Sequence, residues 1–334
     1  MCIRDRDYVA LETIRELQKI DQQNEYFILV SPGDDICLQE SANMHIVTVN
    51  WPSYPLWEQI GLPLALKKIK PDLLHCTSNT APVYGNIPLV LTLHDIIFLE
   101  KKQGKNQSMY QRLGRFYRKI IVPQILTKCK RIITVSHFEC NRISHFLHID
   151  KQLLVAVYNG YSQHFIPIRN AQAITARYIK NHPYLFFLGN TDPKKNTARV
   201  LQAYGIYLKK SSQPLPLLIA DLKEEIIDEY LNREGLQEIK KMLYHPGYIP
   251  NTELPAVYSG ASVFIYTSLR ESFGIPILEA MACGTPVITS TTSAMPEITG
   301  PEGILVNPFD PEEIASALLH LEENAEFYES QTAY

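Results

Sequence analysis

Short apolar runs alternate with segments of helical periodicity along most of the chain. The runs have the length and the β-branched or aromatic content of buried strands, and the segments between them repeat apolar residues every three or four positions. This alternation predicts an α/β fold whose sheets are mostly parallel. The predicted strands are 26–31, 45–49, 72–76, 88–93, 131–135 and 153–158 in the first half, and 184–189, 215–220, 242–245, 262–268 and 303–306 in the second.

The alternation weakens between residues 159 and 183, which predicts a boundary between two domains. Asn159-Gly160 is a turn signal, and 334 residues are enough for two hydrophobic cores. We therefore predict an N-terminal domain at 1–165 and a C-terminal domain at 166–334. A doubly wound domain normally opens with a strand and a glycine turn, whereas the first pattern here is a helix from Tyr8 to Ile20. We expect the natural protein to extend beyond this chain at both ends.

One stretch, residues 268–300, combines a strand end, a loop, a short helix and a second strand. Gly274 loosens the backbone before the helix, and Gly284 fits the left-handed position that ends it. Two carboxylates frame the unit, because Glu271 lies in the loop and Glu279 lies on the helix.

This arrangement suits a nucleotide sugar. Ligands of α/β sheets bind beyond the carboxyl ends of the strands, and a helix N-terminus there offers N–H groups and partial positive charge to a diphosphate. Glu279 could accept hydrogen bonds from a ribose, and Glu271 could bind a second polyol. Taken alone, each carboxylate is more typical of a solvated surface residue. The two together, in a unit framed by glycines and prolines, favour a functional site.

Two further polar segments follow predicted strands. Lys195 lies between the strand 184–189 and a helix, where a lysine can neutralise a phosphate. His94 and Asp95 follow the strand 88–93. A single lysine or histidine in such a place is also typical of a surface or of a structural hydrogen bond. We therefore leave Lys194 open and interpret His75 and His137 as structural.

Three segments carry a resemblance to a known family. The first is Glu-Ser-Phe-Gly-x-Pro-x-x-Glu-Ala-Met-Ala-Cys-Gly-x-Pro-Val at 271–287, followed by Pro296-Glu297. It resembles the carboxylate–seven–carboxylate motif of retaining, mannosyltransferase-like enzymes of the GT-B fold in glycosyltransferase family 4. The loop 189–196 is similar to the family's Gly-Arg/Thr-x-x-Pro-x-Lys-Asn segment, with Asn190 at the position where many members have arginine. Residues 92–95 resemble its Thr-x-His-Asp segment, and the resemblance covers about residues 8–320.

The resemblance implies two Rossmann-like domains with parallel sheets that face each other across a cleft. It implies transfer of a sugar from a nucleoside diphosphate sugar to a glycan or lipid-linked acceptor, with the anomeric configuration retained. GDP-mannose is the favoured donor. No protein nucleophile is assigned, and with no Asp-x-Asp near a strand end we expect no required metal and no cofactor.

The resemblance also assigns roles to individual residues. Lys195 would bind the diphosphate, Glu271 the donor sugar and Glu279 the ribose, while His94 would approach the donor sugar or the reacting phosphate from the other domain. The remaining donor-binding positions are backbone or loop positions around the nucleotide, namely Gly274, Ile275, Gly189, Asn190, Gly247 and Tyr248.

Composition narrows the class of protein. The chain is 46% hydrophobic and 20% charged, which is typical of a globular protein. The net charge of -3 argues against a general nucleic-acid binder. The six cysteines form no Cys-x-x-Cys pair, so we expect neither structural zinc nor a disulfide framework, and we expect a cytoplasmic location. No apolar run reaches the roughly 18 residues of a spanning helix.

One segment departs from this acidic balance. Residues 101–131 contain ten Lys or Arg and no Asp or Glu, interleaved with apolar residues at helical spacing. The pattern is that of a basic amphipathic helix. It is equally compatible with a solvated surface and with contact to an anionic lipid or a phosphorylated acceptor, which would place the protein on the inner membrane face.

Three other functions remain open from the sequence. Similar folds host nucleotide-sugar epimerases and phosphorylases, and an epimerase would turn over the donor without an acceptor. A nucleotide-sugar-binding remnant would bind without turnover. An NAD-dependent dehydrogenase is disfavoured because no Gly-x-Gly-x-x-Gly fingerprint with an acidic residue about twenty positions on is present.

Overall fold

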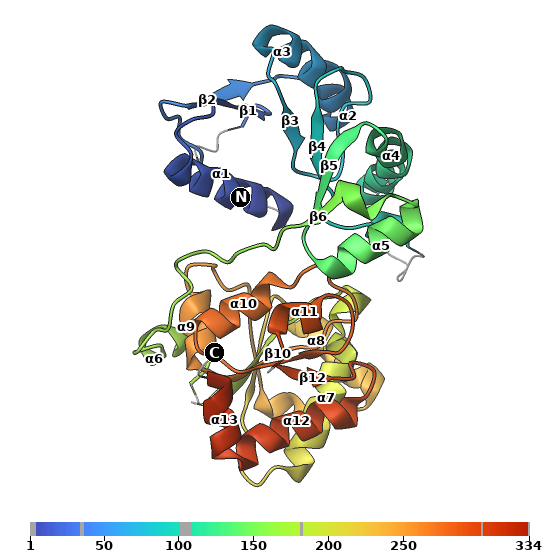
Figure 1. Cartoon of the computed structure of the whole chain (residues 1–334). Coiled ribbons are helices and arrows are strands. Elements are labelled where there is room, and N and C mark those ends of the chain that lie inside the picture. Colours follow the sequence, from blue (N-terminus) through green and yellow to red (C-terminus); the bar gives the residue numbers. More distant parts are fainter. Residues whose placement is uncertain (1–4, 34–36, 101–108, 181–182, 302, 333–334) are drawn as a thin grey trace. The chain divides into compact units, whose positions relative to one another are not determined.

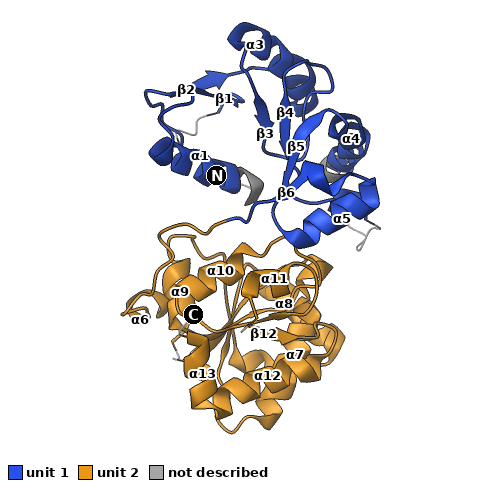
Figure 2. Cartoon of the chain, viewed as in Figure 1, with its two compact units in different colours: residues 1–159 blue, residues 160–334 orange. Residues whose placement is uncertain are grey.

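The structure is a computed structural model that describes residues 5–33, 37–100, 109–180, 183–301 and 303–332. It divides the chain into two compact units, 1–159 and 160–334 (Figure 2). The division falls inside the turn signal Asn159-Gly160, a few residues before the boundary placed at 165.

Unit 1 holds two parallel sheets (Figure 1). One pairs β1 with β2, and the other has the order β3-β4-β5-β6. The elements are α1 (Asp5–Ile20), β1 (Tyr26–Val30), β2 (Met44–Thr48), α2 (Tyr54–Leu56), a π-helical turn (Trp57–Gly61), α3 (Leu62–Ile69), β3 (Leu74–Cys76), β4 (Leu89–Thr92), α4 (Met109–Leu126), β5 (Cys129–Thr134), α5 (His137–Leu147) and β6 (Leu154–Ala156).

The four-stranded sheet of unit 1 is buried by its flanking helices. Leu91 and Ile132 of the central strands pack with Val122 and Ile125 of α4 and with Ile143 of α5. This is the expected consequence of apolar strands in a parallel sheet, because helices cover such sheets on both faces. The α5 helix begins where the Ser136 hydroxyl accepts the Glu139 N–H at 3.2 Å.

The described residues of unit 2 form one six-stranded parallel sheet with helices on both faces (Figure 1). Its strand order is β12-β11-β10-β7-β8-β9, the order of a doubly wound nucleotide-binding fold. The elements are α6 (Gln172–Thr175), β7 (Tyr184–Leu188), α7 (Thr197–Lys210), β8 (Leu217–Ala220), α8 (Glu224–Glu234), β9 (Leu243–Gly247), α9 (Leu254–Gly260), β10 (Ala261–Tyr266), α10 (Ile275–Ala282), β11 (Val287–Ser290), α11 (Met295–Thr299), β12 (Ile304–Val306), α12 (Pro311–Glu323) and α13 (Ala325–Thr332).

Both faces of this sheet are buried, as the apolar strand sequences predict. On one face, Leu185 and Phe187 of β7 join a core made with α7, α8 and α12. On the other, Phe186 packs against Tyr258 and Phe264 with ring centroids 5.3 and 5.4 Å apart. Successive residues of one strand therefore enter opposite cores, which fixes the strand's register.

The α/β class and the parallel sheets are confirmed, but two helices differ from the helical periodicity of the sequence, which runs from Leu56 to Ile69 and from Glu224 to Lys241. The helical pattern from Leu56 to Ile69 starts earlier, at Tyr54, and contains a π-helical turn. The helical pattern from Glu224 to Lys241 breaks at Gly235, whose φ of 69° ends α8 in the left-handed region. None of the helices that the structure describes is long and apolar enough to cross a bilayer.

Candidate functional site

The strand order of unit 2 places a topological switch point at the centre of its sheet. From β7 the chain moves outward through β8 to β9, and it then returns to β10 on the other side of β7. After β7 and after β10 the chain therefore continues toward opposite edges of the sheet, and ligands of open α/β sheets bind at this switch point. Lys195 follows β7 and Glu271 follows β10, so both predicted residues lie at this switch point.

The two side chains form an ion pair. Lys195 Nζ lies 2.7 Å from Glu271 Oε1, and the side chains are only 23% and 13% exposed. Lys195 Nζ also donates to Tyr266 Oη at 3.2 Å and lies 5.1 Å from the centre of that ring. Burial alone would lower the pKa of Lys195, but its neighbours Tyr266 and Glu271 reverse the shift and raise it.

The carboxylate responds in the opposite direction. Burial alone would raise the pKa of Glu271, and the charges of Lys195 and Lys194 outweigh it, so the pKa is lowered. Burial, together with the Glu271 charge, raises the pKa of Tyr266. At neutral pH the cluster therefore holds a lysine cation, a glutamate anion and a neutral phenol.

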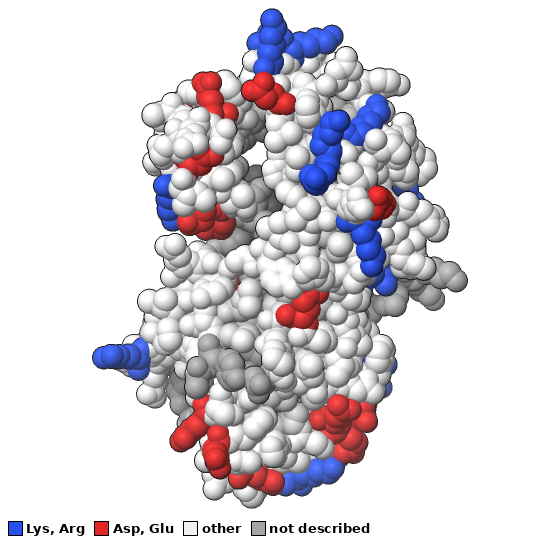
Figure 3. Space-filling view, viewed as in Figure 1, with Lys and Arg blue, Asp and Glu red and all other residues white. Residues whose placement is uncertain are grey.

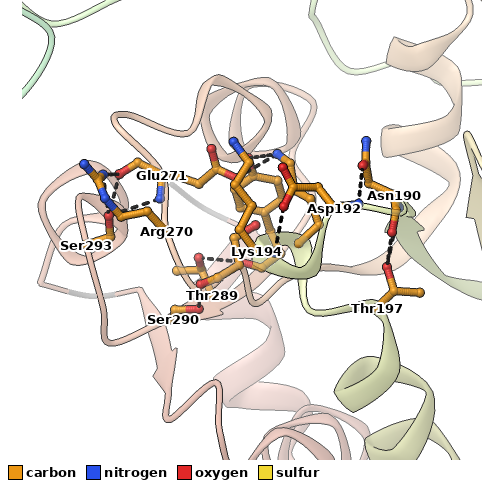
Figure 4. A network of polar contacts seen from close by, with 12 residues as sticks. Asn190, Asp192, Lys194, Thr197, Arg270, Glu271, Thr289, Ser290 and Ser293 are labelled. Carbon is orange, nitrogen blue, oxygen red and sulfur yellow. Dashed lines mark hydrogen bonds and ion pairs between the residues drawn. The ribbon is translucent and has the colours of Figure 1, made fainter. Parts of the chain in front are cut away.

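The loop after β7 is shaped by its own polar side chains. Asn190 Oδ1 accepts the Asp192 N–H at 2.8 Å, and the Asp192 carboxylate accepts the Lys194 N–H at 3.1 Å. Asn196 adopts φ 64°, and its side chain donates to the carbonyls of Thr267 and Pro308. The bonds of Asn190 and Asp192 close the tight turn before Lys195 (Figure 4), and those of Asn196 tie the turn to two other segments of unit 2.

The loop after β10 is anchored by a neighbouring turn. Arg270 Nη1 donates to the Glu271 carbonyl at 2.8 Å and to Ser293 Oγ at 3.2 Å, and the Glu271 N–H donates to the same hydroxyl at 3.1 Å. Figure 4 shows Arg270, Glu271 and Ser293 on one side of the network and Lys194 with Asp192 on the other. Glu271 is therefore held through its backbone by Arg270 and Ser293 and through its carboxylate by Lys195.

The first turn of α10 directly follows this loop. Gly274 has φ +112°, which favours glycine over any L side chain, and Ile275 begins the helix. Pro276 has no N–H, and the Ile277 N–H bonds the Gly274 carbonyl at 3.0 Å. The Ile275 N–H belongs to the group of helix-starting donors that lack an intrahelical acceptor.

Glu279 lies one turn further along α10 and is half-buried. Tyr258 Oη, on α9, donates to its Oε2 at 3.3 Å, and the Tyr258 ring is fully buried. A buried phenol therefore orients the carboxylate. Burial raises the pKa of Tyr258 well above its ordinary value, so it remains a donor throughout the accessible pH range.

The predicted positions Gly189, Gly247 and Tyr248 differ in how closely other atoms surround them. Gly189 is enclosed by packing, because a Cβ there would lie 2.5 Å from Leu222 Cδ1. Gly247 ends β9 with φ +80°, and nothing lies within 4 Å of the place of its Cβ, while Tyr248 beside it is 69% exposed. The backbone at Gly247 is therefore open, whereas Gly189 is explained by the core of unit 2.

His94 lies at the carboxyl end of β4, at the corresponding edge of the unit 1 sheet, and is only 6% exposed. Its Nε2 is 2.8 Å from the Thr77 carbonyl, which can only accept, so Nε2 carries a proton. Its backbone N–H donates to Asn79 Oδ1 at 2.7 Å. The imidazole is fixed in orientation. His75, by contrast, bonds Thr92 Oγ1 at 2.8 Å, in keeping with a structural role.

Three residues of this site had no signal of their own in the sequence. Tyr266 reads as the end of an apolar strand, Arg270 as a surface residue, and Ser293 as part of a polar turn. Only the pairing of β10 with β7 and β11 brings them to the cluster. No cluster of three metal-ligating side chains occurs within the described ranges.

Comparison with known families covers both units. Residues 172–334 match the family described as glycosyl transferases group 1, and residues 8–164 match glycosyltransferase family 4. The O-antigen chain mannosyltransferase B of Escherichia coli is 29% identical over 73% of this chain. The O-antigen chain mannosyltransferase RfbU of Salmonella typhimurium is 25% identical over 82% of this chain and 70% of its own length.

The chain spans 64% of the length of mannosyltransferase B and 36% of the serotype-specific mannosyltransferase WbdA of Escherichia coli. Among solved structures, WaaG, a glycosyltransferase involved in lipopolysaccharide biosynthesis, superposes with a TM-score of 0.73 at 12% identity, over 100% of this chain and 91% of its own. Anabaena HepE, in complex with UDP and glucose, gives 0.64 at 17% identity over 87% and 80%. These two likenesses show the GT-B fold and nothing finer.

Proposed function

Because the chain belongs to the group 1 glycosyltransferases of family 4, we propose that it transfers a sugar from a nucleoside diphosphate sugar to a glycan or lipid-linked acceptor, with retention of the anomeric configuration. The observation that carries this proposal is the Lys195–Glu271 ion pair at the switch point of unit 2. A cation there suits a diphosphate, and the carboxylate beside it suits the hydroxyls of the attached sugar.

In this proposal the donor's own groups carry the proton. The bond between the anomeric carbon and the diphosphate oxygen breaks, and the acceptor oxygen bonds to that carbon on the same face. The departing phosphate takes the proton of the acceptor hydroxyl. Lys195 and the N–H groups at the start of α10 stabilise the charge that develops on the diphosphate, and this is often the largest catalytic contribution. Lys195 and α10 supply this charge without a metal ion.

The remaining residues position the substrates. Glu279, oriented by Tyr258 at 3.3 Å, accepts hydrogen bonds from the ribose. The nucleotide base binds against the backbone of Gly247 and Tyr248; the support is that nothing lies within 4 Å of the Cβ position of Gly247 and that Tyr248 is exposed. His94, whose ring is fixed by the Thr77 carbonyl, contacts the sugar or the reacting phosphate.

The donor sugar is mannose, with GDP-mannose as the donor. The support is that the two O-antigen relatives above are named mannosyltransferases. The nucleotide-sugar part of the proposal is supported by HepE, whose structure holds UDP and glucose.

A lipid-linked acceptor agrees with the surface of α4. Met109, Leu113, Phe116 and Ile120 repeat at helical spacing and are 79%, 62%, 63% and 44% exposed. Arg112 and Lys119 of the same helix are exposed as well. An exposed apolar stripe with basic neighbours is suited to the surface of an anionic bilayer, so the protein acts from the cytoplasmic side as a peripheral enzyme. Residues 101–108 of the basic segment lie outside the described residues.

A donor panel tests the function. The protein is incubated with GDP-mannose, UDP-glucose or UDP-galactose, with and without a mannosylated lipid acceptor, and products are followed by NMR of the anomeric proton. Transfer of mannose with retained configuration, undiminished by EDTA, is expected. Epimerised donor without acceptor would instead identify an epimerase, inverted product would refute retention, and nucleotide binding without turnover would leave only the binding function.

A further inference from the structure

Unit 1 contains a cavity at the edge of its sheet opposite to His94. The cavity has a volume of about 590 Å³, within the usual range for small-molecule sites. Its wall comes from α3 and from the segments that lead into the strands: Pro71 precedes β3, Ile87 precedes β4 and Lys128 precedes β5. Because these strands are parallel, the cavity lies at their amino ends, about 10–20 Å of strand away from the carboxyl edge.

The wall of the cavity is mostly apolar. Leu66, Leu74, Ile87 and Leu89 line it together with prolines. Tyr84, Asn86 and three lysines supply its polar side chains. A sugar or a nucleotide base would leave most of its hydrogen-bonding groups unsatisfied against such a wall, whereas a hydrocarbon chain would not.

The polar part of the lining is cationic. Lys67, Lys70 and Lys128 are exposed at the cavity, and no ion pair is recorded between them and a carboxylate of the described residues. Lys128 Nζ donates to the Val83 carbonyl and lies 5.7 Å from the centre of the Tyr84 ring. Figure 3 shows lysine and arginine side chains at the end of unit 1 where Figure 1 places α3.

We propose that this cavity binds the hydrocarbon chain of a lipid whose phosphate headgroup is held by Lys67, Lys70 and Lys128. The apolar lining takes the chain, and the three ammonium groups complement the anionic head. This site lies at the opposite edge of the unit 1 sheet from His94. A lipid bound there would anchor the protein or regulate it without occupying the carboxyl edge of that sheet.

Calorimetric titration of the full chain with dodecyl phosphate below its micelle concentration tests the proposal. Dodecyl maltoside, which lacks the charge, and inorganic phosphate, which lacks the chain, are the comparison ligands. Dodecyl phosphate is expected to bind at least about fivefold more tightly than either comparison ligand. Dodecyl maltoside lacks the interaction with the lysines, and inorganic phosphate lacks the interaction with the apolar wall. Saturating GDP should leave this affinity unchanged. Equal binding of dodecyl phosphate and dodecyl maltoside, or competition by GDP, would overturn it.

Variants at exposed positions locate the site. Lys67→Gln should weaken dodecyl phosphate binding, whereas Lys68→Gln, the neighbouring exposed lysine that does not line the cavity, should not. Tyr84→Ala removes a ring that is 79% exposed and lines the cavity, so it should also weaken dodecyl phosphate binding. Leu64→Ala, at an exposed apolar residue of α3 that does not line the cavity, should not. Equal losses for Lys67→Gln and Lys68→Gln would show diffuse surface attraction and refute the site.

Discussion

The backbone N–H of Leu269 donates to the carbonyl oxygen of Lys194 across 2.6 Å, which joins the loop after β10 to the loop after β7. This bond fixes the spacing of the two loops, so Lys195 and Glu271 meet although they belong to different βα segments. A charge cluster that is held before a ligand arrives needs little reorganisation during a reaction. The predictions below test which parts of this cluster serve binding and which serve the fold.

Lys195→Ala should weaken the binding of GDP by about 10- to 100-fold and that of guanosine much less, because a charge-assisted bond to a diphosphate contributes about 1.5–3 kcal/mol. Isothermal titration calorimetry with the two ligands measures the difference. Lys194→Ala is the matched control, since this neighbouring lysine forms no ion pair with Glu271 in the structure. Equal losses of GDP and guanosine affinity would contradict the phosphate assignment.

Glu279→Ala should weaken guanosine and GDP alike, by about tenfold, because the ribose is common to both. Tyr258→Phe removes the phenol that orients this carboxylate at 3.3 Å while keeping the buried ring, so a smaller loss of about threefold is expected. The same titrations measure both variants. Unchanged guanosine affinity in Glu279→Ala would remove the residue from the ribose role.

The ion pair also predicts a pH dependence of stability. The lowered pKa of Glu271 means that its contribution is complete above its unfolded pKa and is lost as the pH falls through the folded pKa. The raised pKa of Lys195 means that its contribution is complete below its unfolded pKa and is lost only as the pH rises through the folded value.

Glu271→Gln should therefore lower the free energy of unfolding by about 1.5–3 kcal/mol between roughly pH 5 and 10, and the difference from the wild type should shrink in acid. Urea unfolding at pH 3, 5, 7 and 9 measures it. Glu229→Gln, at an exposed carboxylate on α8 of the same unit, should have little effect at any of these values. A difference that grows toward acid pH would refute the sign.

Gly189→Ala should destabilise the protein by about 1–3 kcal/mol, because its Cβ would overlap Leu222 and Ile219. Thermal unfolding measures the loss. Gly160→Ala is the control, since nothing lies within 4 Å of the corresponding position. Should Gly189→Ala weaken nucleotide binding without lowering the melting temperature, the glycine would serve the ligand instead of the packing.

Replacing Leu113 and Phe116 with serine should reduce co-sedimentation with phosphatidylglycerol vesicles several-fold, because both side chains stand exposed on α4 and burying them in a bilayer is favourable. Ile20→Ser, at a residue 76% exposed on α1, is the matched control. Unchanged co-sedimentation of the double variant would leave α4 as a solvated surface.

Much of the fold could be predicted from local patterns. Apolar runs such as Leu217–Ala220 became central strands, because a strand buried on both faces has no polar alternation to show. Gly284 stands where the sequence predicted the end of a helix, and it has φ +76°. The break of α8 at Gly235 was missed because surrounding residues kept a helical periodicity through Lys241.

By itself, the sequence determined the α/β class. It also singled out Glu271, Glu279 and Lys195 as candidate site residues, since each of these predictions depends on residue types within one short segment. The tertiary structure alone decided that Lys195, Tyr266 and Glu271 form one cluster, because strand order brings β7 beside β10 and no local pattern encodes that pairing. The tertiary structure likewise showed that Gly189 is required by the packing of Leu222. The sequence around Gly189 could not indicate this, because the close contact comes from a side chain far away in the sequence.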